Sequence, residues 1–220
     1  MEKSPRRLWI SAGIAALLLL AAGLTCFFIF RHQPPRDLPG NLIVNGSFER
    51  PEIPTVAKNA DRQAKRQLWM WGYPDEMKPW ETDLENFEIW ASGLIMPRGS
   101  AKTIITPAKS ADGNQNLELI SDPVMQGALW QTAKTHPGKS YTFSFYHSPR
   151  PGAHTTLTVS LNDTVIVKLQ EDGTPIGTLK WEQFTTNFVA DNMATTVRFA
   201  DETDVLGQGT HLDGVVLKEQ

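Results

Sequence analysis

The sequence has almost no cysteine, and this scarcity limits the chemistry that the chain can perform. Its single cysteine, Cys26, lies within an apolar run near the N-terminus, so the remainder of the chain can form no internal disulfide. A cysteine nucleophile and a zinc–thiolate centre are excluded from that remainder too. HExxH, GxSxG and phosphate-binding glycine-loop motifs are also missing from the sequence. We therefore expect a protein that is not an enzyme.

Basic charge is scarce beyond residue 36. Residues 37–220 hold 16 lysines and arginines against 23 aspartates and glutamates, which gives a net charge of −7. A nucleic-acid-binding domain is expected to be basic or to carry a basic stripe. The densest basic group is formed by Arg62, Lys65 and Arg66, in a segment that reads as a loop. Nucleic acid is therefore not an expected partner.

One long apolar run is present, at residues 8–30, LWISAGIAALLLLAAGLTCFFIF. As a helix it would be roughly 35 Å long, enough to cross a bilayer core of about 30 Å. We predict a transmembrane anchor at 8–30, a cytoplasmic tail at 1–7 and a proline-rich linker at 31–40, with the following residues outside the cytoplasm. The alternative is a cleaved signal peptide. It is disfavoured because the run stays bulky to Phe30 and because Thr25 occupies the small-residue position of a lipoprotein cleavage box.

Apolar and polar residues alternate with a period of two over most of residues 41–220. This pattern is typical of strands that bury one face, and turn residues such as Asn45-Gly46 and Pro137-Gly138 separate the runs. The sequence therefore predicts an all-β domain, an antiparallel jelly-roll β-sandwich. The strand-like runs fall at residues 42–44, 87–92, 116–120, 141–145, 156–161, 165–169, 184–189, 196–199 and 212–217.

Residues 50–86 interrupt this regularity as a long, aromatic-rich insertion. It contains RQLWMWGYPDEMKPW, and residues 56–68 within it could form a short surface helix. Loops of this length in a compact domain are usually functional or disordered, and the density of aromatic residues argues against disorder.

The two ends of the domain carry a recognisable pair of motifs. NLIVNGSFE at the start and THLDGVVL at the finish resemble the terminal strands of galactose-binding-domain-like β-sandwiches, which include many carbohydrate-binding modules. The interior segments FEIWASG, ADGNQNLELIS and GALWQTAKTHPGKSYTFSFYHSPRPG resemble the branch found in plant cell-wall and bacterial envelope proteins. The resemblance implies that residues 42–44 and 212–217 lie close together as terminal strands.

Many relatives of this kind bind a structural calcium ion where the termini meet. By that resemblance Glu49 and Asp213 are the carried-over ligands, completed by backbone carbonyls. Relatives often carry a second acidic residue or an asparagine where this chain has Gly214. The simpler interpretation is that Glu49 is a solvated strand-end residue and Asp213 caps a turn.

Sugar binding on such sandwiches depends on aromatic faces and planar polar groups. The candidate ligand-binding residues are Trp71, Tyr73, Trp80, Trp90, Tyr146 and Arg150. Alternatively, these aromatics pack the insertion onto the sandwich, whereas Trp130 and Trp181 read as core or sheet-face residues.

We expect a membrane-anchored, non-catalytic module that binds a polysaccharide or other glycan outside the cytoplasm, a neutral one because of the acidic charge. A protein-interaction or envelope-assembly domain on the same sandwich is the first alternative, and an enzyme of unrecognised type is the second.

Overall fold

The computed structural model describes residues 38–53, 69–93, 97–98, 102–103, 108–120, 126–204 and 208–220. The chain divides into two compact units, Met1–Arg36 and Asp37–Gln220, and all described residues belong to the second. The predicted tail and anchor, most of the linker, the predicted helix at 56–68 and the basic group around Arg62 lie outside the described residues. Within the described part of the chain, no helix has the length and apolar character needed to cross a membrane.

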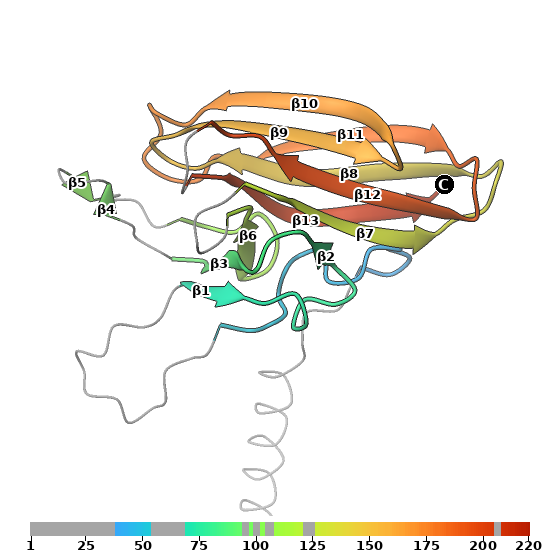
Figure 1. Cartoon of the computed structure of the whole chain (residues 1–220), viewed down its shortest axis with the longest axis horizontal. Helices are drawn as coiled ribbons and strands as arrows, with labels where there is room; N and C mark the ends of the chain where they lie inside the picture. Colours follow the sequence, from blue (N-terminus) through green and yellow to red (C-terminus); the bar gives the residue numbers. More distant parts are fainter. Residues whose placement is uncertain are drawn as a thin grey trace, which may run out of the picture. The chain divides into compact units, whose positions relative to one another are not determined.

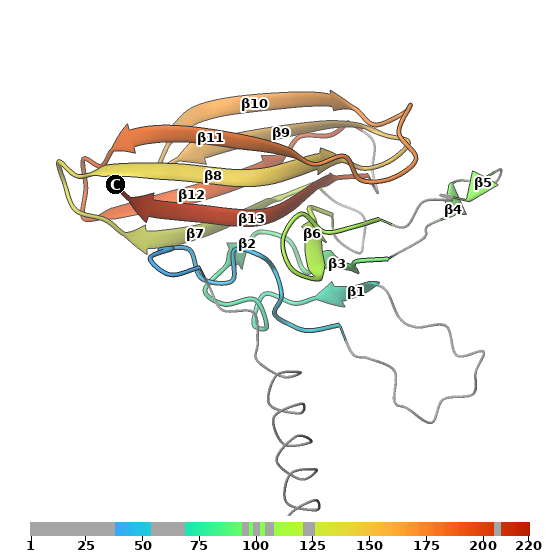
Figure 2. The ribbon, with the colours of Figure 1, turned by 180° about the vertical axis from the view of Figure 1, so that it is seen from behind.

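The first of the two main sheets has six strands in the order β1-β3-β6-β13-β8-β11, and every neighbouring pair is antiparallel. Edge strands β1 and β11 bound it on its two sides (Figures 1 and 2). The strand bounds are Trp69–Gly72 (β1), Phe87–Ala91 (β3), Gln115–Glu118 (β6), Thr210–Glu219 (β13), Ser140–Pro149 (β8) and Glu182–Val189 (β11).

The second main sheet has five antiparallel strands in the order β10-β9-β12-β7-β2. Its strands are Thr164–Asp172 (β10), His154–Leu161 (β9), Ala194–Asp201 (β12), Ala128–Lys134 (β7) and Glu81–Thr82 (β2). A separate two-stranded pair joins Pro97–Arg98 (β4) to Lys102–Thr103 (β5). The prediction of an all-β, antiparallel two-sheet sandwich is thus confirmed.

The hydrophobic core lies between the two sheets and is rich in aromatic rings. Along β8 the side chains of Tyr141, Phe143 and Phe145 point inward and are fully buried, because alternate residues of a strand face the same side. Phe199 of β12 in the opposite sheet meets Phe145 edge to face, with the ring centroids 5.0 Å apart. The polar residues between the inward-facing ones therefore form the two outer faces of the sandwich.

Residues 42–44, at the start of the domain, lie where the sequence predicted but do not form the predicted strand. Residues 42–44 form turns rather than a strand, because Asn45 and Phe48 take φ values of 54° and 52°, which no strand allows. The segment nevertheless lies beside β13, as predicted: the Leu42 N–H donates to the Leu217 carbonyl at 2.8 Å. The amide side chain of Gln131 bonds both the N–H and the carbonyl of Val44, replacing a strand partner.

Candidate functional site

Two of the predicted ligand-binding aromatics, Trp71 and Tyr73, lie near the edge of the six-stranded sheet, together with Trp69, which was not predicted. Trp71 of β1 is opposite Glu88 of β3, so their side chains share the outer face of the sheet. Trp69, opposite Trp90, is on the same face, and its ring meets Trp71 edge to face at 5.8 Å. Tyr73 follows directly and is 53% exposed, while Trp69 is 39% exposed. These three residues, Trp69, Trp71 and Tyr73, form an accessible aromatic group that we call the β1 aromatic edge.

Trp80 does not belong to any surface group, which corrects the prediction that it contacts a ligand. It is 1% exposed and packs between Phe48 and Phe199, at ring distances of 5.5 and 6.3 Å. Its indole N–H donates to the Asn45 carbonyl at 3.1 Å. Both faces of the ring are occupied by the protein, so Trp80 fixes the N-terminal turns onto the core.

Trp90 is likewise buried, at 1% exposure, although it lies on the outer face of its sheet. The guanidinium of Arg150 lies over its ring at 5.3 Å, and His211 meets it edge to face at 4.3 Å. Ala108, Leu179 and Trp181 complete its cover. A sugar has no free ring face to stack on here, so the predicted role of Trp90 in ligand binding is wrong for this conformation.

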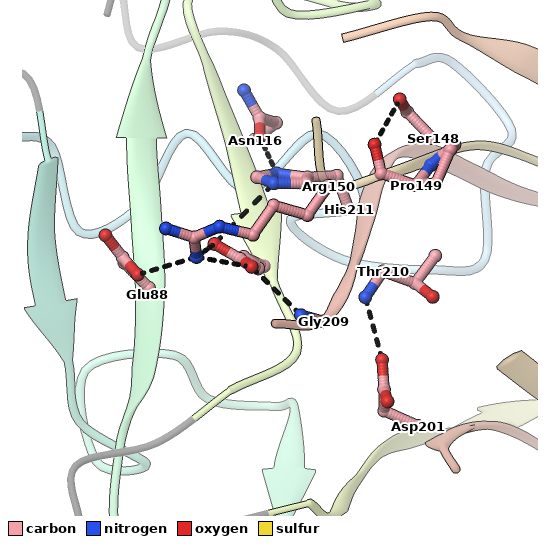
Figure 3. Close-up of polar contacts among 10 residues, drawn as sticks. Glu88, Asn116, Ser148, Pro149, Arg150, Asp201, Gly209, Thr210 and His211 are labelled. Carbon is pink, nitrogen blue, oxygen red and sulfur yellow. Dashed lines mark hydrogen bonds and ion pairs between the residues drawn. The ribbon is translucent and has the colours of Figure 1, made fainter. Parts of the chain in front are cut away.

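Arg150, another predicted ligand residue, belongs to a buried ionic cluster. Its Nη1 lies 2.7 Å from Glu118 Oε1 and Oε2 and 3.9 Å from Glu88 Oε2 (Figure 3). Burial raises the pKa of Glu88 to about 8; the charge of Glu118 adds to this effect, and Arg150 opposes it. Burial also raises the pKa of Glu118. The guanidinium is therefore committed to the protein's own carboxylates.

His211 and Asn116 complete the buried ionic cluster. The imidazole Nδ1 of His211 lies 2.9 Å from Asn116 Oδ1, and the Gly209 N–H donates to Glu118 Oε1 at 3.0 Å (Figure 3). Burial and the charge of Arg150 hold the pKa of His211 well below its ordinary value, so the ring is neutral. A convergent carboxylate pair with raised pKa values is a signature of catalytic sites. However, Glu118 is 0% exposed and Glu88 is 5% exposed, so both carboxylates are buried.

Tyr146 is half-buried on the same outer face, opposite Asp213 of β13 and Gln183 of β11. It packs so closely against Gly214 that a Cβ there would contact the tyrosine ring. Tyr146 therefore lies beside β13, several strands away from the β1 aromatic edge.

The two predicted metal ligands, Glu49 and Asp213, approach the same loop. Glu49 Oε1 accepts the N–H groups of Asn114 and Gln115, and Asp213 Oδ2 accepts the Asp112 N–H at 2.8 Å. Burial raises the pKa of Glu49, and it raises that of Asp213 to about 8; the charge of Asp112 adds to both shifts. The backbone N–H groups use only part of the hydrogen-bonding capacity of each carboxylate. A cation would bind the remaining lone pairs of the carboxylate oxygens.

A different group has the spacing of a metal site. The ligand atoms of His147, Glu171 and Glu182 all lie within 4.8 Å of one another. No sequence motif predicts this group, because its three residues are distant in the sequence and come from three strands, β8, β10 and β11.

A depression on the outer face of the five-stranded sheet was not predicted. Its volume is ≈ 400 Å³, and it is lined by one aromatic ring with carboxylate, amide, hydroxyl and guanidinium groups around it, from Asp83, Trp130, Asn162, Asp163, Thr196 and Arg198. We call it the Trp130 depression. Trp130 and Arg198 are direct partners across β7 and β12, so both side chains point outward. The sequence left Trp130 as either a core or a sheet-face residue, outside the predicted ligand set, and the structure places it on the sheet face.

The lining of the Trp130 depression is held rigidly by backbone contacts. Asn162, at the tip of the β9–β10 hairpin, accepts the Thr196 N–H on its Oδ1 at 2.9 Å, and its own N–H donates to the Thr196 carbonyl at 2.7 Å. Asp83 accepts the Ala128 N–H at 2.6 Å. Among the described residues Arg198 forms no ion pair, although its charge helps to lower the pKa of Glu202.

No protein-family model and no curated protein matches the chain. Among solved structures, it is similar to TmCBM61 in complex with β-1,4-galactotriose, at 12% identity over 82% of this chain and 99% of that chain, with a TM-score of 0.47. A family 16 carbohydrate-binding module matches at 16% identity over 80% of this chain and 99% of that one, with a TM-score of 0.40. A family 35 module from Clostridium thermocellum matches at 9% identity over 68% and 96%, with a TM-score of 0.37.

These similarities agree with the resemblance to carbohydrate-binding-module sandwiches noted in the terminal motifs. They do not confirm the narrower branch of plant cell-wall and bacterial envelope proteins. At TM-scores below 0.5, the ligand has to be argued from this chain's own residues, because one fold hosts many functions.

Proposed function

We propose that this protein binds a carbohydrate without transforming it, and that the Trp130 depression is its binding site. The observation that carries the proposal is the composition of that depression: an indole ring surrounded by groups that donate and accept hydrogen bonds. The C–H face of a sugar stacks on an indole, and its hydroxyls need both donors and acceptors. The volume falls at the lower end of the roughly 300–1,000 Å³ typical of ligand sites.

The charges around Trp130 favour a neutral glycan. Two carboxylates, Asp83 and Asp163, line the depression against one guanidinium, Arg198. Residues 37–220 as a whole carry a net charge of −7. An anionic polysaccharide would be repelled both by the two carboxylates of the depression and by the net negative charge of residues 37–220. The carboxylates can instead accept hydrogen bonds from the hydroxyls of a neutral polysaccharide.

A polysaccharide pull-down tests this proposal. The full chain, purified in a mild detergent, would be incubated with a panel of insoluble neutral and anionic polysaccharides. We expect retention on at least one neutral polysaccharide and its loss in Trp130→Ala, with Tyr73→Ala as the matched control because Tyr73 is an exposed aromatic elsewhere. Equal retention of Trp130→Ala and the unaltered chain would contradict the proposal.

A protein-docking function is the second candidate, and the β1 aromatic edge supports it. Trp69 and Tyr73 are exposed on or next to an edge strand, where unpaired backbone groups accept an added strand. Retention on a polysaccharide that is lost in Trp71→Ala but kept in Trp130→Ala would move the glycan site to this edge. A folded chain that binds no glycan at all would favour docking.

We propose also that residues 8–30 anchor the domain to a membrane and hold it outside the cytoplasm. The support is the uncharged apolar run itself, which is long enough to span a bilayer. Extraction of cell membranes at alkaline pH would leave an anchored chain in the pellet, and external protease would degrade residues 37–220 in intact spheroplasts. Release at alkaline pH would contradict the anchor.

A structural calcium ion between Glu49 and Asp213 remains part of the proposal. The support is two buried carboxylates that converge on residues 112–115, an arrangement whose like charges a cation would offset. The ion would supply charge neutralisation and would tie the N-terminal turns to β13.

Removal of calcium should therefore lower the thermal stability. We expect a chelator to reduce the Tm of the full chain by several degrees and added calcium to restore it, because a ligand that binds only the folded state stabilises it. Asp213→Asn should abolish the response, whereas Asp191→Asn, an exposed control, should keep it. A Tm that is independent of both chelator and calcium would remove the ion from the account.

A further inference from the structure

His147, Glu171 and Glu182 meet where the edges of the two sheets approach each other. Glu171 belongs to β10, the edge strand of the five-stranded sheet, and Glu182 to β11, the edge strand of the six-stranded sheet. Both views show β10 and β11 along the same side of the sandwich (Figures 1 and 2). His147 of β8 is the register partner of Glu182, so its ring lies beside that carboxylate.

The three side chains present the ligand set of a divalent transition metal. Their ligand atoms lie within 4.8 Å of one another, and His147 Nδ1 is 3.0 Å from Glu171 Oε2. Two ligands on a tetrahedral zinc ion, each about 2.0–2.1 Å from the metal, are about 3.3 Å apart, so this pair already has the required spacing. An imidazole nitrogen with two carboxylates suits zinc and its first-row neighbours, whereas calcium and magnesium prefer an all-oxygen shell.

The burial of the group supports a site built into the fold. The side chain of His147 is 6% exposed and that of Glu171 is 17% exposed, while Glu182 lies at the surface. His147 is fixed in place by β8 and packs against Phe145, with the ring centroids 5.7 Å apart. Within the described part of the chain, neither glutamate forms an ion pair with a lysine or arginine: Glu171 pairs only with His147, and no ion pair is formed by Glu182.

We propose that His147, Glu171 and Glu182 bind a divalent transition-metal ion of the zinc class, which clips the edge strands of the two sheets together. The ion occupies a separate place from the glycan site and from the calcium site. Its function is structural: it closes the side of the sandwich at which both sheets end, using one ligand from the five-stranded sheet and two from the six-stranded sheet. Solvent supplies the fourth ligand, because Glu182 is exposed.

Zinc titration of the full chain tests this site. The measurement is the shift in Tm on adding zinc in detergent solution with saturating calcium present throughout, so that any calcium site is already filled. We expect zinc to raise the Tm by several degrees and additional calcium to leave it unchanged. Cobalt(II) in place of zinc should produce the visible absorption of a bound, low-symmetry ion.

Glu182→Gln is the decisive variant, because it removes one ligand at the surface while keeping the size of the side chain. We expect it to weaken zinc binding about tenfold or more. His154→Asn is the matched control: His154 is exposed and pairs with a single carboxylate, Asp172, at 3.3 Å. It should leave the zinc response intact. No zinc-dependent shift, the same shift in Glu182→Gln as in the unaltered chain, or a shift lost in His154→Asn would each overturn the proposal.

Discussion

At the scale of single residues, burial decides which aromatic side chains serve the core and which can serve a ligand. Trp71, Trp80 and Trp90 were all predicted to contact a ligand, yet Trp80 and Trp90 are 1% exposed and Trp71 is only half-buried. Sequence could not separate them, because the positions of Trp80 and Trp90 depend on Phe199 and His211, which are more than a hundred residues away.

Truncation of Trp80 should be severely destabilising. We expect Trp80→Ala to reduce the free energy of unfolding by about 3–5 kcal/mol, because it opens a cavity between Phe48 and Phe199 and leaves the Asn45 carbonyl without its indole donor. Tyr73→Ala, at an exposed position, should change it by about 0.5 kcal/mol or less. Urea denaturation of both variants makes the comparison, and equal values would contradict the placement of Trp80 in the core.

The buried Glu88 should make stability fall as the pH rises. Its pKa is raised from 4.5 to about 8, so between these values the folded state retains a proton that the unfolded chain has released. Below about pH 4.5 Glu88 is protonated in both states, so it adds no pH dependence to the free energy of unfolding. Between about pH 4.5 and pH 8 that free energy falls as the pH rises. The charged groups that face it are Glu118, which opposes its ionisation, and Arg150, which favours it.

Glu88→Gln removes this titration. We expect the variant to have a Tm a few degrees above that of the unaltered chain at pH 8 and close to it at pH 4.5, as measured by thermal unfolding at both values. Glu85→Gln, an exposed neighbour in sequence, is the control and should show no such difference. A Glu88→Gln variant that is less stable at pH 8 would mean that the ion pair with Arg150 outweighs the cost of burial.

At the scale of elements, alternating patterns predicted strands well, and they failed where the backbone departs from regular geometry. The runs around β3, β8, β9 and β12 became strands with their apolar residues inward, because a period of two matches a sheet with one buried face. Residues 42–44 have the same apolar character and form turns. The chain turns here because Asn45 and Phe48 have left-handed backbone conformations. In the sequence, only the Asn45-Gly46 pair indicates such a turn.

The contact between these N-terminal turns and β13 requires glycine at position 46. A Cβ at Gly46 would overlap the carbonyl oxygen of Val215, a backbone atom that cannot move aside alone. We expect Gly46→Ala to lower the free energy of unfolding by about 1–3 kcal/mol. Gly177→Ala is the matched control, since a Cβ there meets nothing within 4 Å and should have little effect. Chemical denaturation measures both, and a neutral Gly46→Ala would contradict this close approach.

At the scale of the whole molecule, the two outer faces of the sandwich carry different groups of side chains. The face of the six-stranded sheet is occupied by its own ionic cluster around Arg150, Glu88 and Glu118. The face of the five-stranded sheet holds the Trp130 depression, where Asp83 and Asn162 each accept one backbone N–H and Asp163 and Arg198 form no ion pair among the described residues. The acidic charge of residues 37–220 could be read from the sequence, and it is the basis for proposing a neutral glycan as the ligand.

The location of the depression could not be predicted from the sequence. Alternation along β7 and β12 indicates that Trp130 and Arg198 point outward, because Leu129 and Phe199 point inward. However, the site also needs Asp83 and the Asn162-Asp163 hairpin tip, which only the sheet order β9-β12-β7-β2 brings together. Three of the six predicted residues, Trp71, Tyr73 and Trp80, came from the aromatic insertion, whose many aromatic residues gave a stronger signal than the single Trp130 on its strand.

The most direct test of the central proposal is calorimetric titration of the full chain with a soluble oligosaccharide of the neutral polysaccharide that retains it. Trp130→Ala and Trp71→Ala would be titrated alongside, since both remove a half-buried indole from an outer face. We predict that Trp130→Ala weakens binding about tenfold or more, as expected for a central aromatic contact, while Trp71→Ala leaves the Kd unchanged. An unchanged Kd in Trp130→Ala, with binding lost in Trp71→Ala, would contradict the placement of the site on the five-stranded sheet.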